Sequence, residues 1–232
     1  MELTNNKSAI IEELITKSCL KQQIFKNTKS VFEQFKSQSY TLMNDLIVEM
    51  KDKDPSLELE YKENGAYEIQ LKIAGDIIIL SMHTNVFNFY DAHEIHKMEY
   101  SKKDSANIYC GMIEIYNFLS DSFRYDRLND TGYLIGRIFI NKENHFFVDG
   151  TRQLGFLYND FGNMILNEVY INTILETCIL YSIGFDLWVP AFGEVQELSV
   201  AEMINKSGVT PHKTSKRLGF NLEEIKNLKK ID

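Results

Sequence analysis

The stretch LELEYKENGAYEIQLKIAGDIIIL, from Leu57 to Leu80, decides the fold. Apolar side chains alternate with Glu, Gln and Lys in LELEY and again in AYEIQLKIA, which is the period of a strand with one buried face. The intervening KENG indicates a hairpin turn, because Gly65 can adopt a positive φ. DIIIL follows Gly75 and is apolar on both faces, as in a central strand. These residues predict an antiparallel hairpin that continues into a third strand.

The sheet is predicted to continue towards the C-terminus. Strands are expected in NIYCGMIEIYNF, GYLIGRIFI and HFFV, and TRQLGFLY is a weaker candidate. NKEN and DG indicate hairpin links. If both are turns, Arg137 lies opposite Val148 and Arg152 lies opposite Phe147, which places the two arginines on opposite faces of the sheet. The middle of the chain is therefore predicted to be an antiparallel meander.

Helical periodicity brackets this meander. In the first fifty residues apolar side chains recur three and four apart, which predicts a short helix and then a long one, with a break near KNTKS and an end before Pro55. From Phe161 to Ile183 the same spacing returns with few charges, so a long buried helix is expected there. N-terminal helices, a central sheet and a later helix predict an α+β fold.

The last residues carry the clearest helix-capping signals. Ser199 and Glu202 form a capping box, and Thr210 and Asn221 can each cap a further short helix. Three short helices joined by tight turns have the layout of a helix-turn-helix unit. The pattern departs from that unit at Thr214 and Arg217, which stand where apolar, inward-facing residues are expected. A helical docking arm is therefore an alternative interpretation of these residues.

Charge divides the chain at the same place. Residues 199–232 hold seven basic and four acidic residues, whereas the formal net charge of the whole chain is −8. We therefore predict an α+β core domain over residues 1–198 and a basic helical extension over residues 199–232. Lys213, Lys216 and Arg217 are three and four residues apart, so one helix face would present all of them to a nucleic-acid backbone. The alternative is that the extension packs against its own acidic body.

The composition is that of a folded protein in a reducing compartment. Hydrophobic residues are 44% and charged residues 25%, and the three cysteines include no CxxC pair. The N-terminal residues lack an apolar signal region, and the most apolar stretch is interrupted by Glu176, Gly184 and Asp186, so no membrane partner is expected. We expect a cytoplasmic protein, and the abundance of Lys, Asn and Ile favours a bacterial source.

Arginine is unevenly placed in a chain that prefers lysine. Most of the arginines fall in the predicted meander, namely Arg124, Arg127, Arg137 and Arg152. Arginine offers a planar fork for phosphate or carboxylate that lysine does not match. Arg124 and Arg127, in SFRYDRLND, are therefore candidate ligand-binding residues on a loop. The alternative is a set of internal ion pairs with neighbouring aspartates.

Histidines raise the question of a metal. His83, His93 and His96 lie within one segment with carboxylates nearby, and imidazoles at such spacing can bind a divalent metal. HEIH lacks the HExxH spacing, however, and a solvated loop with scattered histidines is the alternative. No other cofactor is expected.

A metal-dependent nuclease would need acids and a lysine presented from neighbouring strands. Glu60-x-Lys62 and Glu68-x-Gln70 fall on predicted strands, but alternating strands produce such triplets by chance and no partner acid is clearly placed. The chain also has no phosphate-cradling glycine loop and no GxSxG motif.

Together these patterns predict a non-enzymatic cytoplasmic binding or regulatory protein that contacts a nucleic acid or a nucleotide through its basic extension and its arginine-bearing loop. A metal-dependent nuclease or other phosphodiester enzyme is one alternative, and a protein–protein adaptor is another. The strand GYLIGRIFI is apolar on both faces apart from Arg137. Helices or a second copy of the chain must cover both faces, so a homodimer is a further hypothesis.

Overall fold

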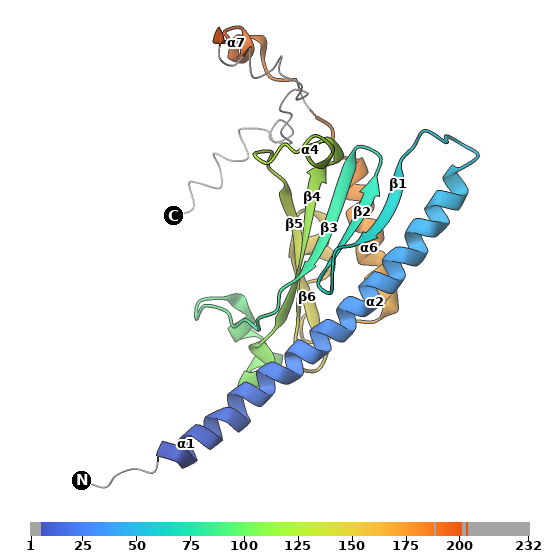
Figure 1. Cartoon of the computed structure of the whole chain (residues 1–232). Coiled ribbons are helices and arrows are strands. Elements are labelled where there is room, and N and C mark those ends of the chain that lie inside the picture. Colours follow the sequence, from blue (N-terminus) through green and yellow to red (C-terminus); the bar gives the residue numbers. More distant parts are fainter. Residues whose placement is uncertain (1–5, 188, 201–202, 204–232) are drawn as a thin grey trace.

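The α+β fold is confirmed by a computed structural model that describes residues 6–187, 189–200 and 203. A long N-terminal helix and a later helix pack on one antiparallel sheet (Figure 1). The predicted boundary between residues 198 and 199 stays a prediction, because almost all of the predicted extension lies outside the described residues. Among the described residues, no helix has the length and apolar character needed to cross a membrane.

The N-terminal helical region runs without interruption from residue 6 to residue 50. Helix α1 (Asn6–Glu13) leads through a π-helical turn, η1 (Leu14–Ser18), into α2 (Cys19–Met50). The predicted break near KNTKS is wrong. Thr28, in the middle of that stretch, is buried and its hydroxyl donates a hydrogen bond to the Ile24 carbonyl 2.8 Å away, so the residue supports the helix.

The predicted antiparallel meander is also confirmed. Six strands pair in chain order, and every pair is antiparallel. The strands are β1 (Leu59–Glu63), β2 (Glu68–Ile73), β3 (Asp76–Met82), β4 (Gly111–Leu119), β5 (Tyr133–Ile140) and β6 (Phe146–Gly150). Gly65 has a φ of 78° in the β1–β2 turn, where the expected hairpin requires a left-handed residue.

The predicted register of the last hairpin is wrong by one residue. Arg137 lies opposite Asp149 and not opposite Val148. The turn after β5 is one residue longer than NKEN implies, because Ile140 lies opposite Phe146 and the Asn141 amide donates to the His145 carbonyl at 3.0 Å. Asn144 closes that turn in the left-handed conformation, with a φ of 61°.

The candidate strand TRQLGFLY is wrong as well. DG belongs to β6, and the chain then leaves the sheet at Arg152, whose φ is 49°. The following residues form a short helix, α5 (Gln153–Leu157). Arg152 and Phe147 are therefore not cross-strand partners.

Helix α6 (Glu168–Ile183) begins seven residues later than the sequence periodicity suggests. Asn167 starts it, because its side-chain oxygen accepts a hydrogen bond from the Tyr170 amide at 3.0 Å. One face of the helix is buried against the sheet, whereas Val169, Leu180 and Ile183 are exposed on the other.

Helices α2 and α6 share one hydrophobic core with one face of the sheet. Its fully buried side chains include Phe32 and Phe35 of α2, Ile78 and Leu80 of β3, and Leu175 of α6. The opposite face of β5 and β6 carries Phe139 and Phe147, which pack in a second cluster against residues 87–110. The end of β5 at Phe139 is thus covered on both faces within one chain, whereas Leu134, at the other end of the strand, is 39% exposed.

The second cluster covers only one end of that opposite face. Its covering segment contains η2 (Glu94–Lys97), α3 (Glu99–Lys103) and η3 (Ser105–Ile108), and the far end of the sheet is bordered by α4 (Ser120–Arg124). A short helix, α7 (Phe192–Val195), follows α6 along the chain. We call the part of the sheet between the second cluster and α4, built on β1, β2 and β3, the open face (Figure 1).

Candidate ligand-binding hollow on the open face

Alternation along β1 and β2 directs a set of polar side chains to the open face. Glu60 lies opposite Lys72, and Lys62 lies opposite Gln70. Successive side chains of a strand point to opposite faces, so the apolar residues between these positions enter the core while the polar ones remain outside. The same alternation that predicts the strands therefore gathers Glu60, Lys62, Gln70 and Lys72 on one surface.

Helix α4 forms one wall of a hollow over these residues. The chain turns directly from β4 into α4, and the Ser120 amide donates to the Gly75 carbonyl at 2.7 Å, which ties the helix to the β2–β3 turn. The hollow has a volume of about 440 Å³. It is lined by Glu58, Glu60, Lys62, Gln70, Lys72, Ile77, Ser120, Phe123 and Arg124.

Glu58 connects two cations of the hollow. Its carboxylate forms an ion pair with Lys72, and its other oxygen lies 4.0 Å from Nη1 of Arg124. The hydrogen bond from Lys72, followed by the charges of Lys72 and Arg124, holds the pKa of Glu58 below its usual range. Glu58 and Arg124 are both largely exposed, so this contact can open at little cost.

Lys62 has no ion-pair partner among the residues that the structure describes. The hollow therefore carries three cations, Lys62, Lys72 and Arg124, against the two carboxylates Glu58 and Glu60. An aromatic side chain lies beside these charges, because Phe123 is partly exposed and packs edge-to-face on Phe118 with ring centroids 5.4 Å apart. A hollow with cations and an exposed ring can hold an anionic group attached to a flat ring.

The structure separates the two arginines that the sequence places in one loop site. The Arg124 side chain is 59% exposed and lines the hollow, whereas the Arg127 side chain is only 5% exposed. Arg127 forms an ion pair with the equally buried Asp130 at 3.7 Å. Arg127 is therefore an internal structural residue, as the alternative interpretation expects, and only Arg124 remains a candidate ligand-binding residue.

The other two arginines of the meander lie elsewhere. Arg137 pairs with Asp149 on β6 and stacks over the Phe139 ring, with its guanidinium carbon 5.5 Å from the ring centroid. Arg152 lies over the ring of Tyr181 on α6, at 5.7 Å. Neither arginine lines the hollow.

The histidines have separate local contacts. Nδ1 of His83 accepts from the Asn85 amide at 3.1 Å, Nδ1 of His93 accepts from the Ile95 amide at 3.2 Å, and Nε2 of His96 lies 3.3 Å from the Phe89 carbonyl oxygen. Among the described residues, no three His, Cys, Asp or Glu side chains come together as potential metal ligands. The structure thus does not gather the three candidate metal ligands. Beside Glu60 and Lys62 it places one further acid, Glu58, which pairs with Lys72.

One further prediction cannot be placed. Lys213, Lys216 and Arg217, the candidate nucleic-acid contacts of the extension, lie outside the described residues. Sequence reasoning also missed part of the hollow, since it did not single out Glu58, Lys72 or Phe123. The alternation in LELEY and YEIQLK gives the signal for the first two.

Comparisons of the chain with models of protein families, with curated proteins and with solved structures found no match.

Proposed function

We propose that this chain is a non-enzymatic cytoplasmic binding protein, and that the hollow on its open face binds a phosphate-bearing ligand, either a nucleotide or a nucleic acid. The observation that carries the proposal is the convergence of Lys62, Lys72 and Arg124 beside Phe123. Lys62 and Lys72 come from one hairpin, whereas Phe123 and Arg124 come from helix α4, which is far from that hairpin in sequence. The cations suit a phosphate group, and the ring suits a base.

Glu58 supports the same proposal, because its carboxylate lies between Lys72 and Arg124, where a phosphate oxygen would receive the same contacts. A phosphate group carries more charge and more acceptor oxygens than a carboxylate, so it can replace Glu58. Once Glu58 turns aside, the hollow presents three cations against Glu60 alone. The basic residues Lys213, Lys216 and Arg217 are a proposed second contact for a ligand that extends along the chain.

The test is binding of a fluorescent oligothymidylate, and separately of ATP, at low salt, where phosphate contacts are strongest. We expect Lys62→Gln and Arg124→Gln each to weaken binding about tenfold, which corresponds to about 1.4 kcal/mol. Lys97→Gln is the matched control, because it removes an equally charged side chain from the segment at the other end of the sheet.

Each result has a distinct meaning for the proposal. Binding of the oligothymidylate but not of ATP supports a nucleic-acid ligand, and the reverse supports a nucleotide. If the wild-type protein binds neither probe, or if Lys97→Gln weakens binding as much as the two hollow variants, the proposal is wrong.

A further inference from the structure

The first turns of the N-terminal helical region lack a packing partner among the described residues. Residues 6–19 are all exposed, and Ile24 is the first buried residue of the helix. Figure 1 shows this end extending past the sheet. We call residues 6–23 the free helix.

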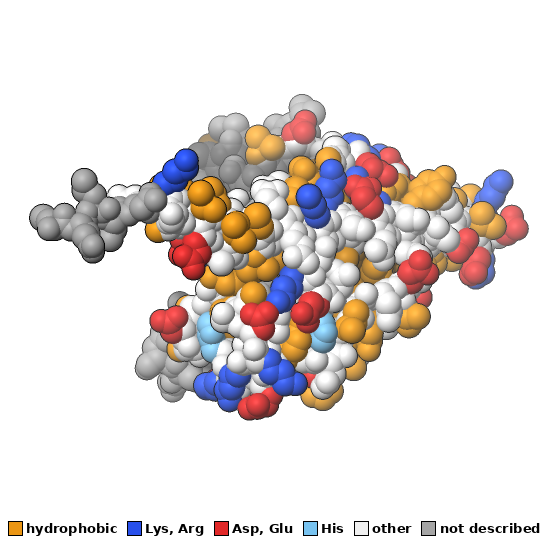
Figure 2. Space-filling model, turned by 90° about the horizontal axis from the view of Figure 1, so that it is seen from below, with side chains coloured by type: hydrophobic (Ala, Val, Ile, Leu, Met, Phe, Trp, Pro, Cys, Tyr) orange, Lys and Arg blue, Asp and Glu red, His pale blue; other side chains and the backbone are white. Residues whose placement is uncertain are grey.

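The free helix nevertheless has an apolar side. Ile10, Ile11, Leu14 and Ile15 lie within six residues and are between 47% and 63% exposed. Figure 2 shows hydrophobic side chains gathered on the part of the molecule that leads to the N-terminus. A contiguous apolar surface of this kind on a charged, folded chain marks an interaction site.

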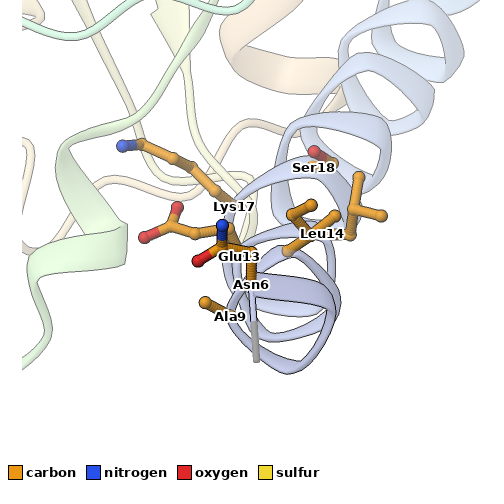
Figure 3. A pocket seen from close by; sticks show the side chains of 7 residues that line it. Asn6, Ala9, Glu13, Leu14, Lys17 and Ser18 are labelled. Carbon is orange, nitrogen blue, oxygen red and sulfur yellow. The ribbon is translucent and has the colours of Figure 1, made fainter. Parts of the chain in front are cut away.

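Helical spacing arranges these side chains in rows. Residues four apart on a helix lie one above the other on the same side. Ile10 and Leu14 therefore form one row, and Ile11 and Ile15 form the next. A groove of about 540 Å³ runs beside the first row, between Leu14 and Ser18 on one side and Glu13 and Lys17 on the other (Figure 3). Rows and grooves of this kind are the surfaces through which helices pack.

We propose that the free helix pairs in antiparallel orientation with the free helix of a second copy of this chain. The charged residues beside the apolar rows favour a second copy of this chain as the partner. Glu13 and Lys17 are one turn apart and point to the same side (Figure 3). In an antiparallel pair of identical helices, the same side of each helix faces the partner. Glu13 therefore meets Lys17 of the partner subunit, and two-fold symmetry forms the contact twice.

The length of the free helix selects the same register. The contact between Glu13 and Lys17 of the partner subunit places the two-fold axis at Ile15. Asn6 then lies level with Ile24 of the partner subunit, which is the residue where that helix enters its own body. The free helices thus overlap along their whole length, about 27 Å at 1.5 Å per residue.

The parallel arrangement is less favourable. In a parallel pair, one side of a helix faces the other side of its partner, and residues with similar numbers lie at the same level along the axis. Glu13 therefore meets Glu12 of the partner subunit, and like charges repel. The antiparallel pair avoids this contact and still covers the two apolar rows.

The dimer is expected to be weak, because a few helical turns bury less than the roughly 800 Å² per partner of a stable interface. Sedimentation equilibrium over a wide concentration range should show reversible dimerisation of the wild-type chain. Ile11→Ser and Ile15→Ser should each raise the dissociation constant at least tenfold, while circular dichroism confirms that the fold is kept. Val48→Ser is the control, since it changes an exposed apolar residue at the other end of α2.

Charge variants test the orientation. Glu13→Lys alone and Lys17→Glu alone should each weaken the dimer, since like charges then face each other. An equimolar mixture of the two variants should recover dimers, because every cross-helix contact in the mixed pair is again between opposite charges. The mixture leaves the contacts within each helix unrepaired, so recovery cannot come from helix stability.

Two results would overturn the proposal. One is a wild-type chain that stays monomeric at all accessible concentrations, in which case the free helix serves a different protein. The other is a mixture of the two charge variants that dimerises no better than either variant alone. Neither result bears on the hollow, because the free helix and the open face share no residues.

Discussion

Glu58 is the residue on which the proposed binding mode depends most closely. Its carboxylate pairs with Lys72 and approaches Arg124, which are the contacts proposed for the ligand. We predict that Glu58→Gln tightens binding of oligothymidylate or ATP several-fold, because the neutral amide no longer competes for the two cations. Fluorescence anisotropy at constant salt measures this change. Glu94→Gln is the control, because Glu94 pairs with Lys97 outside the hollow. Weaker binding of Glu58→Gln would show that the carboxylate assists the ligand and does not compete with it.

Gly111 marks a close contact between β4 and α2. A Cβ atom at this position would lie 2.0 Å from the hydroxyl oxygen of Thr28, and Thr28 is fully buried. We predict that Gly111→Ala lowers the free energy of unfolding by about 1–3 kcal/mol, as other overpacked sites do. Gly75→Ala should change it by less than about 0.5 kcal/mol, because no atom lies within 4 Å of the added carbon. Urea denaturation of both variants measures the two changes in the free energy of unfolding. Equal losses of unfolding free energy in the two variants would mean that the close contact with Thr28 does not cause the destabilisation.

At the residue scale, the sequence indicated which arginines to consider but not what each one does. Arg124 and Arg127 are close in sequence and chemically identical. Their difference depends on the loop after α4, where the Asp126 backbone is left-handed with a φ of 48° and Arg127 turns inward to Asp130. Hydrogen bonds within the loop hold that turn, including the one from the Arg127 amide to the Ser122 carbonyl at 2.8 Å. No pattern of charges in SFRYDRLND distinguishes an exposed arginine from a buried one.

At the scale of elements, strands were predicted well because their alternation is local. The stretch around Leu57–Leu80 gave three strands in the correct order, and both turns have left-handed residues, Gly65 and Ala74. The errors fall where one backbone conformation overrides the pattern. Asn144 shifts the register of the last hairpin, and Arg152 ends the sheet where hydrophobic residues suggested another strand.

Helix α6 illustrates how an apolar pattern can mislead about burial. Leu175 is fully buried against the sheet, whereas Leu180 is 69% exposed. We predict that Leu175→Ala lowers the free energy of unfolding by about 2–5 kcal/mol, and that Leu180→Ala changes it by less than about 0.5 kcal/mol. The two substitutions remove the same atoms, so thermal or urea unfolding compares the environments directly. A large loss in Leu180→Ala would mean that the outer face of α6 is covered in solution.

At the scale of the whole molecule, the basic extension is expected to add phosphate contacts to those of the hollow. We predict that replacing Lys213, Lys216 and Arg217 together by Gln leaves the unfolding transition unchanged, as exposed charges contribute little. The dependence of log K on log salt for oligothymidylate should flatten by roughly two units, at about 0.7 per phosphate contact with a single strand. An unchanged slope would mean that the extension makes no contact with the nucleic acid.

The α+β class followed from periodicity, but the hollow could not be predicted in the same way. Lys62 and Lys72 belong to one hairpin, and their common face follows from alternation. Arg124 and Phe123 join them only because α4 folds back against the β2–β3 turn through the hydrogen bond from Ser120 to Gly75. Contacts between residues so distant in sequence leave no local pattern.

We propose that the hollow on the open face binds a phosphate-bearing ligand. An amide-resolved NMR titration of the wild-type chain, with ATP and with a short oligothymidylate in separate samples at low salt, tests it most directly. We predict saturable shifts for at least one ligand, largest around Lys62, Lys72 and Arg124 and absent from the outer face of α6. Shifts centred on any other surface, or no saturable shift with either ligand, would contradict it.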